Sequence, residues 1–522
     1  MGGALGRSSL SEPEGAAARP DGSPDAEMAT LARGGRLNVF GFVLRLAGMA
    51  PFLFIGGRIY GPAALGRFAY AVLTVEFAAQ VAALGLRRGL AQLLANGKKP
   101  QAWIVADGML VALIASAVST AILVLFPKAM YPTTEVHGLD RLLAISWTDI
   151  ALAALAYHND VASTVRARSL VQPWTITIVA FGWSYVSLED GLIIAYVFSM
   201  VAALVAALIP LLKCYGLPRG WSPDLPTAWM TAWRNVPVAA ADAVEWASRR
   251  IDLAVLGAFL PAAFVGIYYA AQQVATLPAK LKTSFEPVLG PAIVRRIAAG
   301  DLPAVAAQVR QVTYWIIAAQ LGIALALGIP GRAVMGLVGS KFTGGTAMLG
   351  FLLAAEVIAA SAFVCEAALI YVARKRNMIL SIVMLALEAV GAAALILIMR
   401  GETLPQTFQA TGPAIALCIA LGFAWITKSW LLSKELGESV TGWRWDLAWA
   451  TGAGVAVGGA LRLLLPPAWQ LAGVPAILIA FGAVLWTKGF GPEDRELFRM
   501  RKHEVQELRD AEAREETMTN IV

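Results

Sequence analysis

Residues 191–212 read GLIIAYVFSMVAALVAALIPLL, an uninterrupted apolar stretch without a single charged side chain. A helix of this length crosses the roughly 30 Å hydrocarbon core of a bilayer. Similar segments recur along the chain, which is 58% hydrophobic and only 15% charged, whereas soluble domains are about 25% charged. The sequence therefore predicts an all-α polytopic membrane protein with about fourteen transmembrane helices.

The predicted spans divide into two halves and an appended pair. The first residues are rich in Ala, Gly, Ser and Pro and contain no apolar run, which is typical of disorder. We expect a disordered cytoplasmic tail at 1–32, an N-terminal six-helix bundle at 33–212, a cytoplasmic linker at 213–234, a C-terminal six-helix bundle at 235–435, two extra transmembrane helices at 436–490 and a charged cytoplasmic tail at 491–522.

Basic residues indicate the orientation. Clusters such as Arg374-Lys375-Arg376 alternate with loops that hold one or two bases, and Arg166 and Arg168 are assigned to one of the basic connections. Because cytoplasmic loops are enriched in Lys and Arg, this alternation places both termini in the cytoplasm. It also accounts for the formal net charge of +7, so no nucleic-acid partner is expected.

Two distant segments resemble each other. Residues 61–71, GPAALGRFAYA, are echoed by LPAAFVGIYYAA at 260–271. Gly66 aligns with Gly266, and Pro62 aligns with Pro261 if one residue is inserted. The offset corresponds to six predicted spans, an even number, so both copies have the same orientation. The repeat predicts two parallel bundles.

Charged residues inside the spans point to a function. The predicted seventh span, 235–259, reads NVPVAAADAVEWASRRIDLAVLGAF, and four of its charges share one helical face while Arg250 lies off it. Such charges usually face a protein interior or a water-filled cavity. The four are Asp242, Glu245, Arg249 and Asp252; further charges within spans are Arg45, Glu76, Asp149, Lys280, Lys282, Glu286, Glu356, Glu366 and Glu388.

Two interpretations of these charges remain open. In the first, the bases line a cavity that binds an anion, because Arg stays charged when buried and grips phosphate with two donors; the acids then bind the coupling proton or cation. In the second, pairs such as Arg249 with Glu245 only form an internal network. The candidate substrate cavity comprises Arg45, Arg249, Arg250, Lys280 and Lys282, and the candidate ion-coupling residues are Asp242, Glu245 and Asp252.

Catalytic motifs are missing from the sequence. It contains no GxxxxGK[ST], HExxH or GxSxG pattern, and its three histidines and three cysteines are scattered. We therefore expect no enzyme activity, cofactor or metal. A polymerase or ligase acting on polyprenyl-linked glycans ranks third among the hypotheses, because the longest predicted outer loop, 127–141, is too short to enclose a substrate.

The halves resemble the polysaccharide exporters of the MOP flippase superfamily, relatives of MATE antiporters and of the lipid II flippase. The carrying residues are the paired turns Gly66-Arg67-Phe68 and Gly266-Ile267-Tyr268, and Pro287 ahead of the basic pair Arg295-Arg296. The segment around Gly339, Lys341 and Phe342 looks like the family's turn before span ten. The resemblance covers roughly 33–435.

This resemblance implies two bundles around a cationic cavity with alternating access. It also implies an O-antigen type flippase for a polyprenyl-diphosphate-linked oligosaccharide in the bacterial inner membrane, with membrane lipids and a polysaccharide polymerase or glycosyltransferases as partners. Its cavity positions would match Arg45, Arg249, Arg250 and Lys280. The nearest alternative is a cation-coupled small-molecule exporter of the MATE type, which Asp242 and Glu245 favour.

Overall fold

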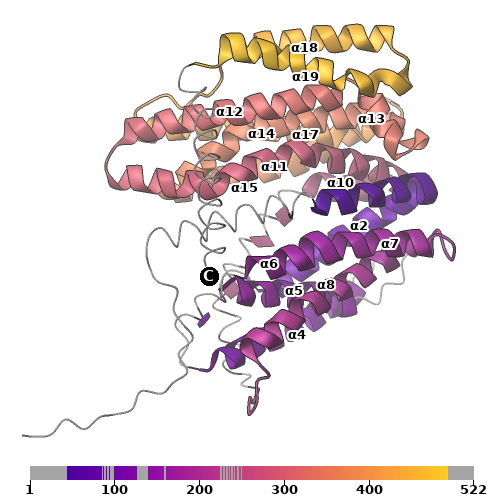
Figure 1. The fold of residues 1–522 in the computed structure, drawn as a ribbon, viewed down its shortest axis with the longest axis vertical. Helices are drawn as coiled ribbons and strands as arrows, with labels where there is room; N and C mark the ends of the chain where they lie inside the picture. The colour runs from indigo at the N-terminus through magenta and orange to yellow at the C-terminus, as the bar shows by residue number, and fades with distance from the viewer. Residues whose placement is uncertain are drawn as a thin grey trace, which may run out of the picture.

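The computed structural model describes residues 44–84, 99–125, 139–157, 160–223 and 250–491, together with isolated positions at 41, 86–94 and 226–247. The regular secondary structure of this part is entirely helical (Figure 1). Eight of its helical segments are long and apolar enough to cross a membrane. The all-α class is confirmed, while the total of fourteen spans stays a prediction. The predicted tail at 1–32 lies outside the described residues, as do most of the tail at 491–522 and of the loop at 127–141.

A first group of helices comes from the N-terminal half (Figure 1). Helix α8 packs on α5 and α7, and α2 packs on α4 and α5. The group comprises η1 (Gly56–Tyr60), α2 (Gly61–Ala82), α4 (Gln101–Leu125), α5 (Leu139–Tyr157), α6 (Val161–Thr164), η3 (Val165–Val171), α7 (Gln172–Trp183) and α8 (Gly191–Tyr215). It also holds the helical stretch 44–55 that leads into η1.

One boundary in this group corrects the sequence prediction. Arg166 and Arg168 were expected in a cytoplasmic connection, yet α6, η3 and α7 follow one another without a break over 161–183. Both arginines therefore lie on a continuous helix and not in an irregular loop, while their place on the cytoplasmic side stays a prediction. Ser163, Thr164 and the two bases lower the hydropathy of this stretch, so composition alone makes it look like a loop.

The second group comes from the C-terminal half. Helix α14 packs on α11, α12 and α17, and α15 packs on α10 and α17. The group comprises α10 (Ile251–Phe259), α11 (Ala262–Ala298), α12 (Leu302–Gly328), α13 (Gly331–Val338), η4 (Ser340–Gly345), α14 (Thr346–Val372), α15 (Arg374–Gly401), α16 (Gln406–Gln409) and α17 (Gly412–Leu436). Gly437, with a φ of 73°, ends α17 in the left-handed conformation that glycine favours at helix ends.

A helical pair follows at the edge of the molecule (Figure 1). It consists of α18 (Trp445–Leu464), η5 (Pro467–Gly473), α19 (Val474–Val484) and η6 (Leu485–Gly489), and it packs chiefly on α12. Glycines permit this approach, because a Cβ on Gly458 would lie only 2.6 Å from Cδ1 of Ile329.

The two groups cross where α2 and α11 begin, which we call the crossing end. A Cβ on Gly66 would lie 2.8 Å from the Gly266 nitrogen and 2.6 Å from the Ala262 carbonyl carbon, and one on Gly266 would meet Gly66 and Pro62 in the same way. This reciprocity makes Pro62 equivalent to Ala262. The predicted match of Pro62 with Pro261 through an inserted residue is therefore wrong, and the offset is a constant 200 residues.

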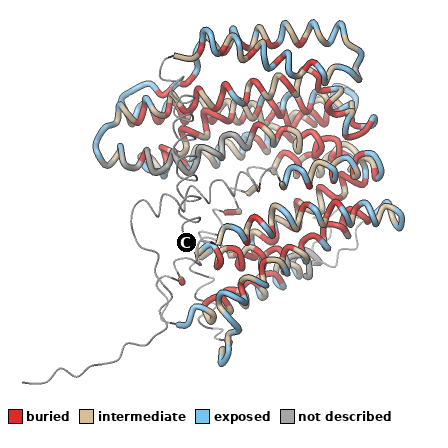
Figure 2. Tube along the Cα trace, in the orientation of Figure 1, coloured by how far each residue is buried: buried red, intermediate tan, exposed pale blue. Residues whose placement is uncertain are grey.

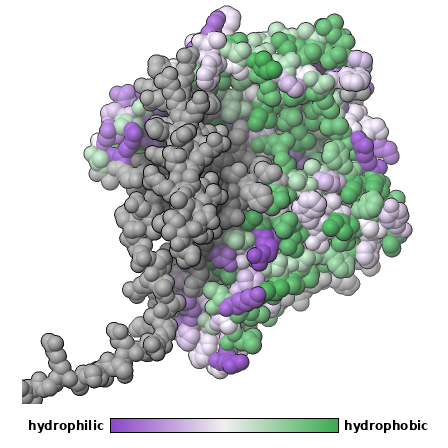
Figure 3. All heavy atoms as spheres, in the orientation of Figure 1, coloured by the Kyte–Doolittle hydropathy of each residue, from purple (hydrophilic) through white to green (hydrophobic). Residues whose placement is uncertain are grey.

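Side chains on the outward faces of the helices are mostly apolar. Figure 2 shows buried residues along the faces between neighbouring helices, and Figure 3 shows broad apolar areas over the helix sides. Ile178, Val390 and Ile426 are 65–70% exposed although they are aliphatic. Exposing such a surface to water costs free energy, whereas exposing it to lipid chains does not. The helix sides are therefore suited to a bilayer.

Candidate functional site

Three helices of the first group place a charged residue at the same depth. Each of these residues lies fifteen positions from the crossing end of its helix, which corresponds to a rise of about 22 Å. The pairs of charged residue and helix end are Arg45 and Tyr60, Glu76 and Gly61, and Arg168 and Trp183. This depth is well inside a bilayer.

Arg45 lies among charges of both helical groups. Its side chain is exposed, and the charges of Arg168, Glu76 and Arg250 act on it. Arg250 precedes α10 in the other half of the chain, so the charges that act on Arg45 come from both helical groups. An exposed guanidinium at this depth is available to an anionic ligand.

Arg168 is the best-anchored base of the cluster. It forms an ion pair with Asp149 of α5, and its Nη1 donates a hydrogen bond of 3.2 Å to Oε1 of Gln172. About a quarter of its side chain remains accessible. Asp149 therefore fixes the guanidinium in one orientation and leaves part of it open.

Aromatic residues close the cluster on the side of the crossing end. The Tyr196 hydroxyl donates to Oε1 of Glu76 at 3.4 Å, and the charges of Arg250, Glu76 and Arg45 act on Tyr269. The Phe68 ring lies 6.0 Å from the Tyr196 ring and 6.1 Å from the Tyr269 ring. All three rings are buried, so this layer separates the charges from the crossing end.

The balance of charge in the cluster is cationic. Among the described residues it contains three arginines and two carboxylates, and Asp149 is committed to Arg168. We call Arg45, Glu76, Asp149, Arg168 and Arg250 the central cluster. Its bases come from both helical groups, so an anion bound here would contact both.

A second site lies inside the second group. The Asp252 carboxylate accepts hydrogen bonds from the Tyr268 hydroxyl at 2.7 Å, from the backbone N–H of Leu253 at 2.7 Å and from Nε2 of Gln272 at 3.2 Å. Asp252 is only 2% exposed. The Asp252 carboxylate is therefore held by donors from α10 and α11.

Glu388 of α15 is the acidic neighbour of Asp252. It is 1% exposed, and neither of its carboxyl oxygens has a hydrogen-bond partner among the described residues. The charges of Asp252 and Glu388 act on each other. A buried carboxylate without donors is so unfavourable that the group takes up a proton instead. We call Asp252 and Glu388, which are both buried, the acid pair.

Arg250 connects the two sites. Its charge acts on Arg45 and Tyr269 in the central cluster and on Asp252 in the acid pair. A change in the protonation of the acid pair would therefore change the electrostatic potential at Arg250, the base that the second group contributes to the central cluster.

The other predicted site residues have different outcomes. Asp242 is buried. Glu245 and Arg249 lie outside the described residues, as do the side chains of Lys280 and Lys282, which sit on α11. In the described part of the chain, no group of three or more His, Cys, Asp or Glu side chains could hold a metal ion.

Sequence reasoning missed two roles. Arg168 was placed in a loop, and Glu388 was noted only as a single acid within a span. The available signal was the same for both: an ionisable residue within a helix of membrane length. Their partners, Asp149 and Asp252, lie on other helices, so sequence spacing could not reveal them.

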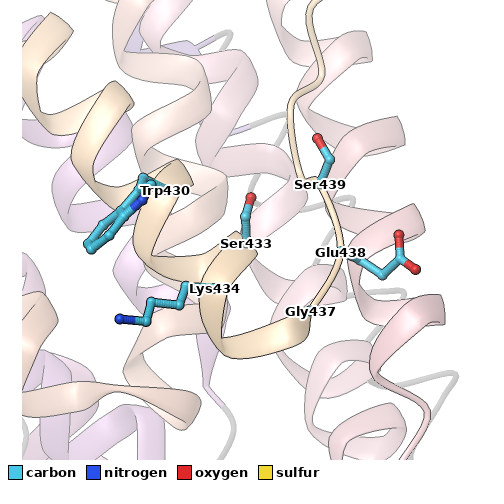
Figure 4. Close-up of a pocket in the computed structure, with 6 residues that line it drawn as sticks. All are labelled: Trp430, Ser433, Lys434, Gly437, Glu438 and Ser439. Carbon is cyan, nitrogen blue, oxygen red and sulfur yellow. The ribbon is translucent and has the colours of Figure 1, made fainter.

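An open depression lies at the end of α17, apart from these sites. Its lining residues are Trp430, Ser433, Lys434, Gly437, Glu438 and Ser439. Figure 4 shows Trp430 and Lys434 projecting to one side, where the ammonium lies 5.4 Å from the ring centroid, and Glu438 pointing away. Pairs of Trp and Lys are common where a helix leaves a membrane.

Comparison of this structure with solved structures identifies the fold. The chain is similar to the lipid II flippase MurJ in an inward closed conformation, with a TM-score of 0.64, 11% identity and coverage of 87% of this chain and 99% of that chain. It is also similar to an inward-facing multidrug resistance MATE family transporter of the MOP superfamily, with a TM-score of 0.57, 13% identity and coverage of 76% and 98%.

A third similar structure is a MOP superfamily transporter from Pyrococcus furiosus, described as having a binding pocket of reverse polarity. It has a TM-score of 0.52, 14% identity and coverage of 80% of this chain and 96% of that chain. No family model matches the sequence, and no curated protein matches it either. The chain therefore has the fold of MOP superfamily transporters, and the three similar proteins are transporters or flippases rather than enzymes.

Proposed function

We propose that the protein is a flippase that moves a polyprenyl-diphosphate-linked oligosaccharide across the bacterial inner membrane by alternating access. The observation that carries this proposal is the central cluster, which brings charges of arginines from both helical groups to bear on one another inside the bundle. Arg45 and Arg250 supply the donors that a diphosphate needs. The 87% coverage in the flippase alignment, against 76% for the MATE transporter, supports this choice.

The proposal includes a topology. The proposed topology has six spans in each half, the α18–α19 pair and both termini in the cytoplasm. It would put the crossing end on the outer side of the membrane and open the central cluster toward the cytoplasm. The Gly66–Gly266 contact and a hydrogen bond of 3.0 Å from Nε of Arg58 to the Leu337 carbonyl oxygen close the outer end. A substrate would then reach the arginines from the inner leaflet, where the polymerase and glycosyltransferase partners would hand it over or receive it on the other side.

The acid pair supplies the coupling in this scheme. Protonation of the Asp252–Glu388 pair makes the surroundings of Arg250 less negative and strengthens its attraction for a diphosphate. Loss of the proton weakens it. Asp252 was among the predicted coupling residues, and Glu388 now joins it ahead of Asp242.

The proposal is tested by binding of polyprenyl diphosphate to the purified full chain in detergent. Arg45→Ala, Arg168→Ala and Arg250→Ala should each weaken binding by about tenfold or more, because a hydrogen bond to a charged group contributes about 1.5–3 kcal/mol. Arg462→Ala is the matched control, since Arg462 is an exposed base on α18. Wild-type affinity in all three variants would refute the cavity assignment.

A MATE-type exporter of small molecules is the second candidate, because an acid pair in a fold of this kind would also suit cation-coupled export. The two functions differ in their ligand. Binding of organic cations that is lost in Glu388→Gln and unaffected in Arg45→Ala would favour the exporter.

A further inference from the structure

A lysine is buried inside the second group, away from both sites. Lys428 of α17 is 2% exposed, and its Nζ donates hydrogen bonds of 3.0 Å to Oε2 of Glu366 on α14 and to Oγ of Ser381 on α15. Three helices thus meet at one ammonium group. Nothing in the proposed binding of a diphosphate requires it.

Burying the Glu366–Lys428 ion pair costs desolvation free energy, so it is an unfavourable way to join helices. Replacing a buried ion pair with apolar residues is often neutral or stabilising, and ionisable residues within membrane helices commonly mark ion or proton pathways. The two partners are also unequally buried: 40% of the Glu366 side chain is accessible, against 2% for Lys428. Glu366 lies six residues before the end of α14, a depth of about 9 Å, so it is the more accessible partner and lies near a helix end.

Polar residues continue from this pair toward the acid pair. Asn377, Ser381 and Glu388 follow one another on α15 at steps of four and seven, which places them on one helical face. Asn377 and Glu388 are buried, and Oδ1 of Asn377 has no hydrogen-bond partner among the described residues. Seven residues between Ser381 and Glu388 correspond to about 10 Å, a distance that a short chain of water molecules spans.

We propose that Glu366, Lys428 and Ser381 form a proton relay between the end of α14 and the Asp252–Glu388 pair. The inference rests on the proposed coupling role of that pair. Glu366 takes a proton from bulk water; Lys428 passes one of its protons to Ser381, whose own hydroxyl proton leaves through water toward Glu388. Lys428 then takes the proton from Glu366. One proton enters and one leaves, and the ion pair is restored.

Other ionisable groups surround the relay. Cys365 of α14 contacts Ser429, the neighbour of Lys428, at 3.5 Å. Nearer the helix ends, Nη1 of Arg376 on α15 lies 2.5 Å from Oε1 of Glu435 on α17. The Arg376–Glu435 pair is closed on itself, and a thiol is a poor donor at neutral pH, so Glu366 is the group positioned to accept the incoming proton.

Infrared spectroscopy of the full chain in proteoliposomes tests the relay. Perfusion with D₂O shifts the carbonyl stretching band of a protonated carboxyl group, and the band absent from Glu388→Gln belongs to Glu388. Lys428→Met, which retains much of the side-chain volume, should slow deuteration of this band by at least about tenfold, because a positioned proton-transfer group contributes about a hundredfold or more. Glu366→Gln should slow it as well.

The direction of the change separates a relay from a structural role. A variant that merely loosens the packing admits water and speeds deuteration, and Lys434→Met, an exposed lysine on the same helix, should leave the rate unchanged. If Lys428→Met misfolds, Ser381→Ala removes the next hydroxyl with little change in volume. An unchanged or faster rate in these variants overturns the relay while the coupling role of Glu388 stands. If no band is lost in Glu388→Gln, the coupling fails and the relay with it.

Discussion

Replacing Gly66 with alanine should open the crossing end. A Cβ at this position would lie 2.6 Å from the Ala262 carbonyl carbon, whereas ordinary contacts begin at 3.4 Å. The Ala262 carbonyl oxygen lies closer still, so the backbones must separate by more than about 0.8 Å, and neither backbone atom can rotate away. Overpacking of this kind costs about 1–3 kcal/mol, so the ratio of closed to open molecules should fall by about 5- to 150-fold.

Electron–electron resonance between two spin labels can measure this shift. Tyr185 and Glu402 are exposed positions at the crossing end, one in each helical group. Labels at both positions, in a variant whose three native cysteines are replaced, should show a longer distance component in Gly66→Ala.

The matched control is Gly350→Ala, because nothing lies within 4 Å of a Cβ at Gly350. Both variants carry the same chemical change on a membrane-length helix, so only the position differs. Identical distance distributions in the two variants would refute the conclusion that the Gly66–Gly266 contact holds the crossing end closed.

Three further predictions concern other contacts. Trp246→Ala should lower the ratio of closed to open molecules by about two- to tenfold, because Trp246 and Phe77 pair across the groups at 5.6 Å and an aromatic pair contributes about 0.5–1.5 kcal/mol; an unchanged distance distribution between the two spin labels would contradict this. Trp221→Phe should speed tryptic cleavage after Arg219 by about tenfold, as it removes a 2.8 Å hydrogen bond to Asp107; Trp445→Phe is the control. Gly458→Val should lower thermal stability by about 1–3 kcal/mol through its clash with Ile329, whereas Gly452→Val, with open space, should not.

The sequence predicts the helical membrane class and the repeat well, because both are local patterns. The apolar stretch 191–212 is expected as a membrane-length helix and lies within α8 (Gly191–Tyr215). The register of the repeat was misjudged by one residue, since Pro261 looks like Pro62 although Ala262 occupies the equivalent place. The shared residue type suggested the wrong alignment, and the reciprocal contacts of Gly66 and Gly266 give the correct one.

The site is less predictable for a physical reason. Hydropathy shows that Asp252 and Glu388 lie inside spans, but not that they approach each other, because that depends on how α10 packs on α15. Arg168 was assigned to a loop because charged residues are common in loops. In the structure it lies on a helix, where Asp149 on another helix neutralises its charge inside the bundle.

The attachment of the α18–α19 pair has a mechanical consequence. Because the pair packs chiefly on α12, it would move with the second group if the two groups rotate against each other in the proposed alternating access. Viscous drag in a bilayer rises with the cross-section of the rotating body, and opposing torques are equal. The first group, which is the slimmer body in this arrangement, should therefore sweep through the larger angle in each cycle.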